Sequence, residues 1–184
     1  AFNSLDTALY ISWQCPSINT IHVAKGTYKP KHLPYQMQAD RTGIEVAETD
    51  TAYRTFHLRP GTRLYGGYPT GGGFRNANAY ITRLSGDIDL AGNNDCYHVV
   101  LMDCADAWGS YTDSSLIDGF VISGGNARPS GLDIPLNDRV LVSYSGGGIY
   151  ANYGSNYIRN NRIENNKADS DGAGIYYEGS EAGF

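Results

Sequence analysis

The sequence has few cysteines, few basic residues and little methionine or phenylalanine, and each shortage excludes a class of protein. Three cysteines among 184 residues are too few for a disulfide scaffold, and no Cys-x-x-Cys pair of the kind that holds zinc is present. Lys and Arg number 14 against 19 Asp and Glu, which gives a formal net charge of −5. We therefore expect neither nucleic acid nor an anionic membrane as the main partner.

Long apolar runs are also missing. No stretch approaches the roughly 18 apolar residues that a transmembrane helix needs, so we expect no transmembrane segment. No secretory signal is visible, and the opening on Ala1 without a Met indicates a trimmed or mature start. Only 2 Met and 5 Phe accompany 23 Gly and 15 Tyr, and this balance disfavours a coiled coil or a helical bundle.

The three cysteines are Cys15, Cys96 and Cys104. Their odd number allows at most one disulfide within the chain. We interpret them as buried structural thiols, because free cysteine often serves as a small core residue. One internal disulfide is the alternative.

The most informative feature is an internal repeat. The residues Gly-Gly-Ile-Tyr at 147–150 return as Ala-Gly-Ile-Tyr at 173–176, which is an offset of 26. A second alignment sets Ile117 on Ile158 and Ala127 on Ala168 with an offset of 41. The excess is explained if residues 128–144 form a loop inserted into one repeat, since repeat proteins place insertions on one face.

Each repeat contains short extended pieces separated by Gly and Asn rather than a helix. Both residues tolerate positive φ and mark corners of the chain. Such a coil becomes stable only by stacking on its neighbours, with parallel strands about 4.8 Å apart and equivalent Asn residues in hydrogen-bonded ladders. The pattern predicts an all-β fold, a parallel β-helix of roughly five to seven coils.

The N-terminal residues follow a different period. Phe2, Leu5, Ala8 and Leu9 have the spacing of a short amphipathic helix, with Asn3 or Ser4 as its N-cap. A helix in this place would cap the open end of the solenoid. We expect residues 1–184 to form one domain, the N-terminal part of a longer solenoid, whose uncapped C-terminal end could self-associate.

Several segments of the chain resemble a known group of proteins. They are residues 20–30, 64–68, 84–89, 97–100, 117–125 and 146–150. In their order they are similar to bacterial right-handed parallel β-helix repeat proteins of the pectin-lyase-like superfamily, of the secreted or surface-attached type. The resemblance implies a right-handed β-helix and a secreted or outer cell-surface location.

The resemblance does not bring one activity with it. We expect an exported structural or adhesive module, with carbohydrate binding as an added property and no catalytic residue identified. The alternative is a polysaccharide lyase or glycoside hydrolase acting on an acidic polysaccharide. Arg159, Arg162, Glu164 and Asp118 reproduce no catalytic motif of that superfamily, and we interpret them as solvated strand residues.

One acidic segment could bind a metal. Asp87, Asp89, Asn93 and Asp95 alternate along an extended stretch and its turn, and oxygen ligands of this kind suit calcium. The spacing is not that of an EF-hand. The alternative is an Asx-rich turn between two strands.

Aromatic residues cluster in or beside the irregular segments. The four that we select as carbohydrate-binding candidates are Tyr68, Phe74, Trp108 and Tyr111, and Tyr53 belongs to the same wider group. Exposed aromatic faces can stack on sugar rings. The alternative is that these side chains only cover the flank of the solenoid. The histidines are interpreted as packed or surface residues rather than metal ligands.

Overall fold

The structure is a computed structural model that describes residues 2–34, 51–89, 95–103, 114–129, 134–136 and 139–179. Short parallel strands dominate these residues, with one α-helix and one 3-10 helix among them. The elements are α1 (Leu5–Gln14), β1 (Thr20–Ala24), β2 (Gly26–Tyr28), η2 (Thr51–Tyr53), β3 (Phe56–Leu58), β4 (Arg63–Tyr68), β5 (Thr82–Ser85), β6 (Val100–Asp103), β7 (Leu116–Asp118), β8 (Val121–Ser123), β9 (Asn126–Ala127), β10 (Ile134–Leu136), β11 (Arg139–Leu141), β12 (Ile149–Asn152), β13 (Tyr157–Arg159), β14 (Arg162–Ile163), β15 (Lys167–Ala168) and β16 (Ile175–Glu178).

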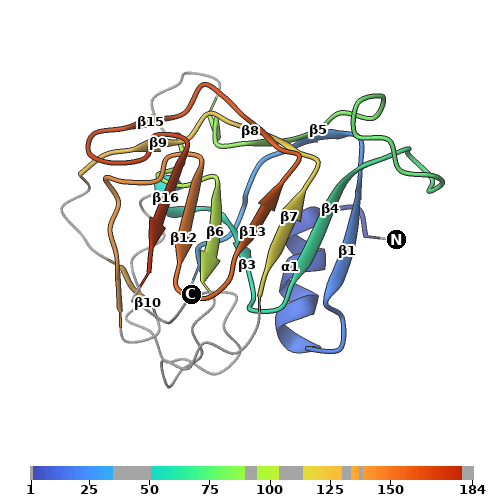
Figure 1. Cartoon of the computed structure of the whole chain (residues 1–184), viewed down its shortest axis with the longest axis horizontal. Coiled ribbons are helices and arrows are strands. Elements are labelled where there is room, and N and C mark those ends of the chain that lie inside the picture. The colour runs from blue at the N-terminus through green and yellow to red at the C-terminus, as the bar shows by residue number, and fades with distance from the viewer. Residues whose placement is uncertain are drawn as a thin grey trace.

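Three four-stranded parallel sheets carry the architecture (Figure 1). Sheet A has the order β1-β4-β7-β13, sheet B has β2-β5-β8-β14, and sheet C has β3-β6-β12-β16. Each turn of the chain therefore adds one strand to every sheet, and the stacked layers are compatible with a parallel β-helix. The expectation of an all-β fold agrees with this arrangement.

The described strands form four layers, which corrects the expectation of five to seven coils. The reason is the length of a layer. Leu64 pairs with Ile117 and Ile117 pairs with Ile158, so successive layers are separated by more residues than the 26-residue offset suggested. Segments inserted between strands, such as the antiparallel β10–β11 hairpin, lengthen each layer.

The strand register confirms both repeat alignments. Ile158 pairs with Ile117, and Ala168 pairs with Ala127, as the offset of 41 predicted. Ile175 pairs with Ile149, as the offset of 26 predicted. The inserted β10–β11 segment lies between β9 and β12, inside the predicted insertion at 128–144.

The main core lies inside the three sheets. One inward-facing position in each strand recurs from layer to layer, and the core includes Leu64, Leu84, Phe56, Ile117, Ile122 and Ile149. Helix α1 covers this core with Leu5, Ala8 and Leu9, all of them buried. The predicted capping helix is thus confirmed.

Two details of the helix differ from the prediction. Phe2 is 53% exposed, so it lies outside the apolar face of α1. Ser4 is the N-cap residue in extended conformation, but its side chain makes no capping hydrogen bond. Its hydroxyl lies 3.5 Å from Asp6 Oδ2 instead.

A second core covers the outer face of sheet C. Leu101 and Tyr150 project outward from β6 and β12, and Leu33, Tyr53 and Leu141 from the connecting segments pack on them. Tyr53 is therefore buried in this cluster, which corrects its assignment to the exposed aromatic loops. Sheet C is covered on both faces, as is usual for a parallel sheet.

The corners are built by Gly and Asn, as predicted. Gly119 has φ of 80° and Asn160, one layer on, has φ of 51°, a conformation that costs most other residues steric strain. At this corner the expected Asn ladder does not form, because the residue one layer back from Asn161 is Phe120. Asn161 donates to Ile117 O at 2.9 Å and accepts from Phe120 N at 2.9 Å. Phe120 lies between β7 and β8, where its N–H has no partner in a strand ladder.

Two strand boundaries depend on pairing between layers. Gly26–Tyr28 forms strand β2, because Gly26, Thr27 and Tyr28 pair with residues of β5. Strand β6 begins at Val100, where pairing with β3 and β12 begins. Local composition does not reveal these limits, since they are set by the pairing partner in the adjacent layer.

Two histidines are fully buried. His57 places Nδ1 3.2 Å from Pro34 O, and its ring lies 4.8 Å from that of Trp13. His98 places Nδ1 3.0 Å from Gly146 O. In both rings Nε2 is buried without a hydrogen-bond partner. Burial lowers the pKa of each histidine to about 4, so both rings are neutral near pH 7.

The Asn161 bridge gives a first prediction. Asn161→Ala leaves Phe120 N–H without its partner and removes a second donor from Ile117 C=O, and we expect the free energy of unfolding to fall by about 1–3 kcal/mol. Urea denaturation of the variant measures the loss. Asn78→Ala, in an exposed turn, is the control and should change the midpoint little. Equal midpoints for the two variants would contradict the bridging role.

The buried histidines give a second prediction. Their folded pKa of about 4 lies below the unfolded value of about 6.5, so the unfolded state binds more protons between these values. Stability is therefore fully present above about pH 6.5 and falls as the pH drops toward 4, by up to about 1.4 kcal/mol per pH unit for each ring. His57→Gln and His98→Gln should each flatten this slope, measured by denaturation at several pH values. A slope equal to that of the parent protein in both variants would show that the rings are not the cause.

Candidate functional site

The outer face of sheet A presents accessible polar and aromatic side chains. Along β1, exposed and buried residues alternate, so Thr20 and His22 point outward while Ile21 and Val23 point into the core. Along β4, Arg63 and Tyr65 point outward and Leu64 points inward. This alternation is the direct consequence of the two-residue period of a strand.

The register joins these outward residues into rows across the layers. One row consists of His22, Tyr65, Asp118 and Arg159, and each of them pairs with the next. The row carries two aromatic rings at one end and charged groups at the other. Directly opposed residues in neighbouring strands lie close enough to act on one ligand.

Tyr68 completes an aromatic surface at the β1 end of this row. Its ring stacks on that of His22 with centroids 4.4 Å apart and an interplanar angle of 17°. Tyr65 meets the same imidazole edge-on at 5.9 Å and 71°. We call His22, Tyr65 and Tyr68 the aromatic platform. His22 is exposed, and Tyr65 and Tyr68 are partly buried, so all three rings can contact a ligand.

A glycine-rich loop follows Tyr68 and is anchored at its far side. Arg75 donates to Gly66 O at 2.7 Å and forms a salt bridge with Asp118 Oδ1. Its guanidinium also lies over the Tyr65 ring, 5.4 Å from the centroid. Asn160 Nδ2 donates to the second carboxylate oxygen of Asp118 at 3.1 Å. Asp118 is thus a buried, paired residue, which corrects its interpretation as a solvated one.

The same loop presents Phe74. This side chain is 97% exposed and directly precedes the anchored Arg75. Gly71, Gly72 and Gly73 on its other side all have positive φ. Of the four predicted carbohydrate-binding residues, the structure places Tyr68 in the platform and Phe74 in the adjacent loop. Trp108 and Tyr111 lie outside the described residues.

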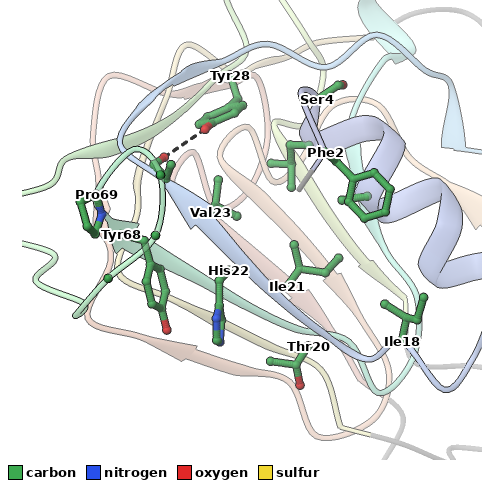
Figure 2. A pocket seen from close by; sticks show the side chains of 16 residues that line it. Phe2, Ser4, Ile18, Thr20, Ile21, His22, Val23, Tyr28, Tyr68 and Pro69 are labelled. Atoms are coloured by element: carbon green, nitrogen blue, oxygen red, sulfur yellow. Dashed lines mark hydrogen bonds between the residues drawn. The ribbon is translucent and has the colours of Figure 1, made fainter.

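A cavity of about 510 Å³ lies beside the platform, along the edge of β1. Figure 2 shows Ile21 and Val23 on one side of the strand and His22 and Tyr68 on the other. The N-terminal part of α1 and the glycine loop form the two ends of the lining. We call this cavity the edge groove. Its volume lies in the range typical of small-molecule and cofactor sites.

The predicted calcium ligands are only partly brought together. Asp87 and Asp95 face each other across an isolated antiparallel bridge, and Asn93 lies outside the described residues. Asp87 Oδ2 lies 3.7 Å from Lys29 Nζ. Partial burial, followed by the negative charge of Asp87, raises the pKa of Asp95. Within the described ranges no group of three His, Cys, Asp or Glu side chains could hold a metal ion, and the calcium site stays a prediction.

The remaining charged candidates form a network on sheet B. Glu164 accepts from Arg83 Nη1 at 3.3 Å and from Arg162 Nε at 3.1 Å. All three side chains are partly or largely exposed, in agreement with the interpretation of Arg162 and Glu164 as solvated strand residues. Both arginines are thus paired with the Glu164 carboxylate.

The cysteines separate into two environments. Cys96 is buried, as expected, and burial raises the pKa of its thiol. Cys15 is exposed, which corrects its interpretation as a core residue, because it follows the last turn of α1. Both are free thiols, and Cys104 lies outside the described residues.

The sequence analysis missed His22 and Tyr65. Their signal was the alternation of β1 and β4, in which every second residue is polar or aromatic and points away from the core. Only the register between β1 and β4 brings these two rings together. Tyr68 was selected as a residue in or beside an irregular segment, and it ends strand β4 directly before the glycine-rich loop.

No protein-family model, no curated protein and no solved structure matches this chain. Within the described part of the chain, no helix combines the length and the apolar character needed to cross a membrane. The function must therefore be argued from the geometry of the site.

The anchoring role of Arg75 can be tested. Arg75→Leu removes the partner of the buried Asp118 carboxylate, and we expect the free energy of unfolding to fall by about 1–3 kcal/mol. Hydrogen exchange of Asn76 N–H, which is bonded to Gly67 O at 2.7 Å, should accelerate as the loop loses its attachment. Arg159→Leu, an outward residue of the last described layer, is the matched control. Unchanged exchange at Asn76 in Arg75→Leu would exclude the anchor.

Proposed function

We propose that this chain is an exported bacterial cell-surface module with a right-handed parallel β-helix fold, and that it binds carbohydrate on the outer face of sheet A. The stacked layers and their register support the fold. The export and surface location rest on the sequence resemblance. The observation that carries the binding proposal is the aromatic platform of His22, Tyr65 and Tyr68.

The platform has the chemistry that a sugar requires. Aromatic faces pack on the apolar C–H face of a pyranose ring, and neighbouring polar groups bond its hydroxyls. His22 and Tyr68 stack at 4.4 Å, which holds both rings in fixed orientation before any ligand arrives. Preorganisation of this kind reduces the entropic cost of binding.

The surroundings of the platform favour a chain-like ligand. Arg63 lies outward on β4, and Arg159 lies at the other end of the row that contains Tyr65. The outward face of sheet A continues over four strands, so a polysaccharide could contact several layers. Phe74 extends the apolar surface into solvent beside the platform.

The alternative is catalysis on an acidic polysaccharide, by a lyase or a glycoside hydrolase. A lyase would require a base that is available to the substrate. On this face Asp118 is held by Arg75 and Asn160, so its carboxylate is already engaged. For this reason we favour binding without catalysis.

The decisive experiment is a glycan array together with a screen of uronate polysaccharides, with and without calcium. We expect binding without release of unsaturated products, followed by ultraviolet absorbance. Tyr68→Ala should weaken binding by about tenfold, because it removes half of the stacked pair. Tyr10→Ala, an exposed tyrosine on α1, is the matched control.

Each other outcome has a definite meaning. Formation of unsaturated products would replace the binding proposal with a lyase. If Tyr68→Ala binds the glycan as strongly as the parent protein does, the aromatic platform is not the binding site. Absence of binding to every glycan would leave a structural spacer as the function.

A further inference from the structure

The edge groove has features that the proposed carbohydrate site does not use. Five consecutive residues of β1, Thr20 to Ala24, line it. Successive side chains of a strand point to opposite faces. A cavity that touches all five must therefore lie along the edge of the strand, next to its backbone (Figure 2).

This edge of β1 has no strand partner in the described part of the chain. Sheet A has the order β1-β4-β7-β13, so β1 is a terminal strand. Its pairing with β4 is regular from Thr20 to His22, and the only shift in register lies between His22 and Ala24. The side of β1 opposite β4 faces the groove.

The hydrogen bonds identify which backbone groups point into the groove. Asn19 O accepts from Arg63 N at 2.7 Å, and Lys25 N donates to Tyr68 O at 2.7 Å. In a parallel pair, alternate residues direct both backbone groups to the same neighbour. Odd-numbered residues thus bond toward β4, and Thr20 and His22 present their N–H and C=O groups to the groove.

The walls of the groove differ on the two faces of β1. On the core-facing side lie Ile21 and Val23 together with Phe2 and Leu5 from the α1 end. On the outward side lie His22 and Tyr68, and Gly71 to Gly73 close the groove without side chains. The described residues that line it include no lysine, arginine, aspartate or glutamate.

An edge strand of this kind is unusual. Natural sheets commonly protect their edges with charged side chains, proline or a covering element. The strand Thr20–Ala24 contains no charged residue and no proline. Among the described residues, a groove rather than a covering segment lies beside it. These are the properties of a site that accepts an additional strand.

We infer that the edge groove binds an extended peptide segment of a partner protein, which pairs with β1 as a fifth strand of sheet A. The peptide bonds to the Thr20 and His22 backbone groups. Its side chains alternate, with apolar residues toward Ile21, Val23 and Phe2 and small β-branched or polar residues toward His22 and Tyr68. Main-chain bonds supply affinity, and the two unlike walls set the sequence preference.

The first test uses one synthetic peptide as the probe. It alternates valine with threonine over about eight residues, which covers the length of β1, and carries a lysine at each end for solubility. Hydrogen exchange followed by NMR should show new protection of the Thr20 and His22 amides. The Ile21 and Val23 amides are already in the ladder with β4 and should change little.

A pair of variants removes the groove-facing donor without touching the β4 ladder. Thr20→Pro deletes an N–H that points into the groove, and proline is tolerated where an edge N–H is unpaired. Thr20→Val keeps the N–H. We expect Thr20→Pro to weaken peptide binding by about five- to tenfold relative to Thr20→Val.

Methylation of the peptide backbone gives an independent readout. Two versions of the peptide are compared, one N-methylated at its odd-numbered residues and one at its even-numbered residues. Only one of the two should lose binding, because only one edge of an added strand faces β1. Three results would each overturn the inference. They are an equal loss of binding by both methylated peptides, equal binding by Thr20→Pro and Thr20→Val, and no binding of the unmethylated probe. Glycan binding by Thr20→Pro should equal that of the parent protein, so failure here is distinct from failure of the carbohydrate proposal.

Discussion

The structure depends on one constraint, the in-register pairing of each layer with the next. Ile117 lies between Leu64 and Ile158 in sheet A, and Ile149 lies between Val100 and Ile175 in sheet C. Because side chains alternate along a strand, a shift by one residue would exchange the core for the surface. The corners must therefore fall at equivalent places in successive layers, and Gly119 and Asn160 meet this need through positive φ.

The outer faces of sheets A and C differ in what covers them. On sheet C, Leu33, Tyr53 and Leu141 fold over the outward residues and bury Tyr150. Its hydroxyl donates to Glu178 Oε2 at 2.5 Å, so this polar group is satisfied within the protein. On sheet A, His22 and Tyr65 stay accessible in the register of their strands. The side chains on the outer face of sheet A can consequently contact a ligand.

At the α1 end, the stacked sheets close their core and leave one strand edge open. Helix α1 buries Leu5 and Leu9 against the interior. It does not pair with β1, since a helix satisfies its own backbone groups. The groove between helix and strand edge combines an apolar wall with unpaired backbone groups, which is the combination that peptide recognition by strand addition uses.

Much of the fold was determined by the sequence itself. The spacing of Ile117, Ile158, Ile163 and Ala168 predicted the register, because identical environments in stacked layers select similar residues. The apolar spacing of Leu5, Ala8 and Leu9 predicted the capping helix for a similarly local reason. Gly and Asn marked the corners. These signals are short-range and periodic, so they are readable without coordinates.

Other features were decided only by the tertiary structure. The number of layers depended on how much chain lies between paired strands. Asn161 bonds the backbone of the preceding layer rather than another Asn, and Tyr53 is buried by a segment far away in the sequence. The stacking of His22 on Tyr68 joins residues 46 positions apart. Such contacts depend on which segments meet in space, and no local pattern of residues encodes that meeting.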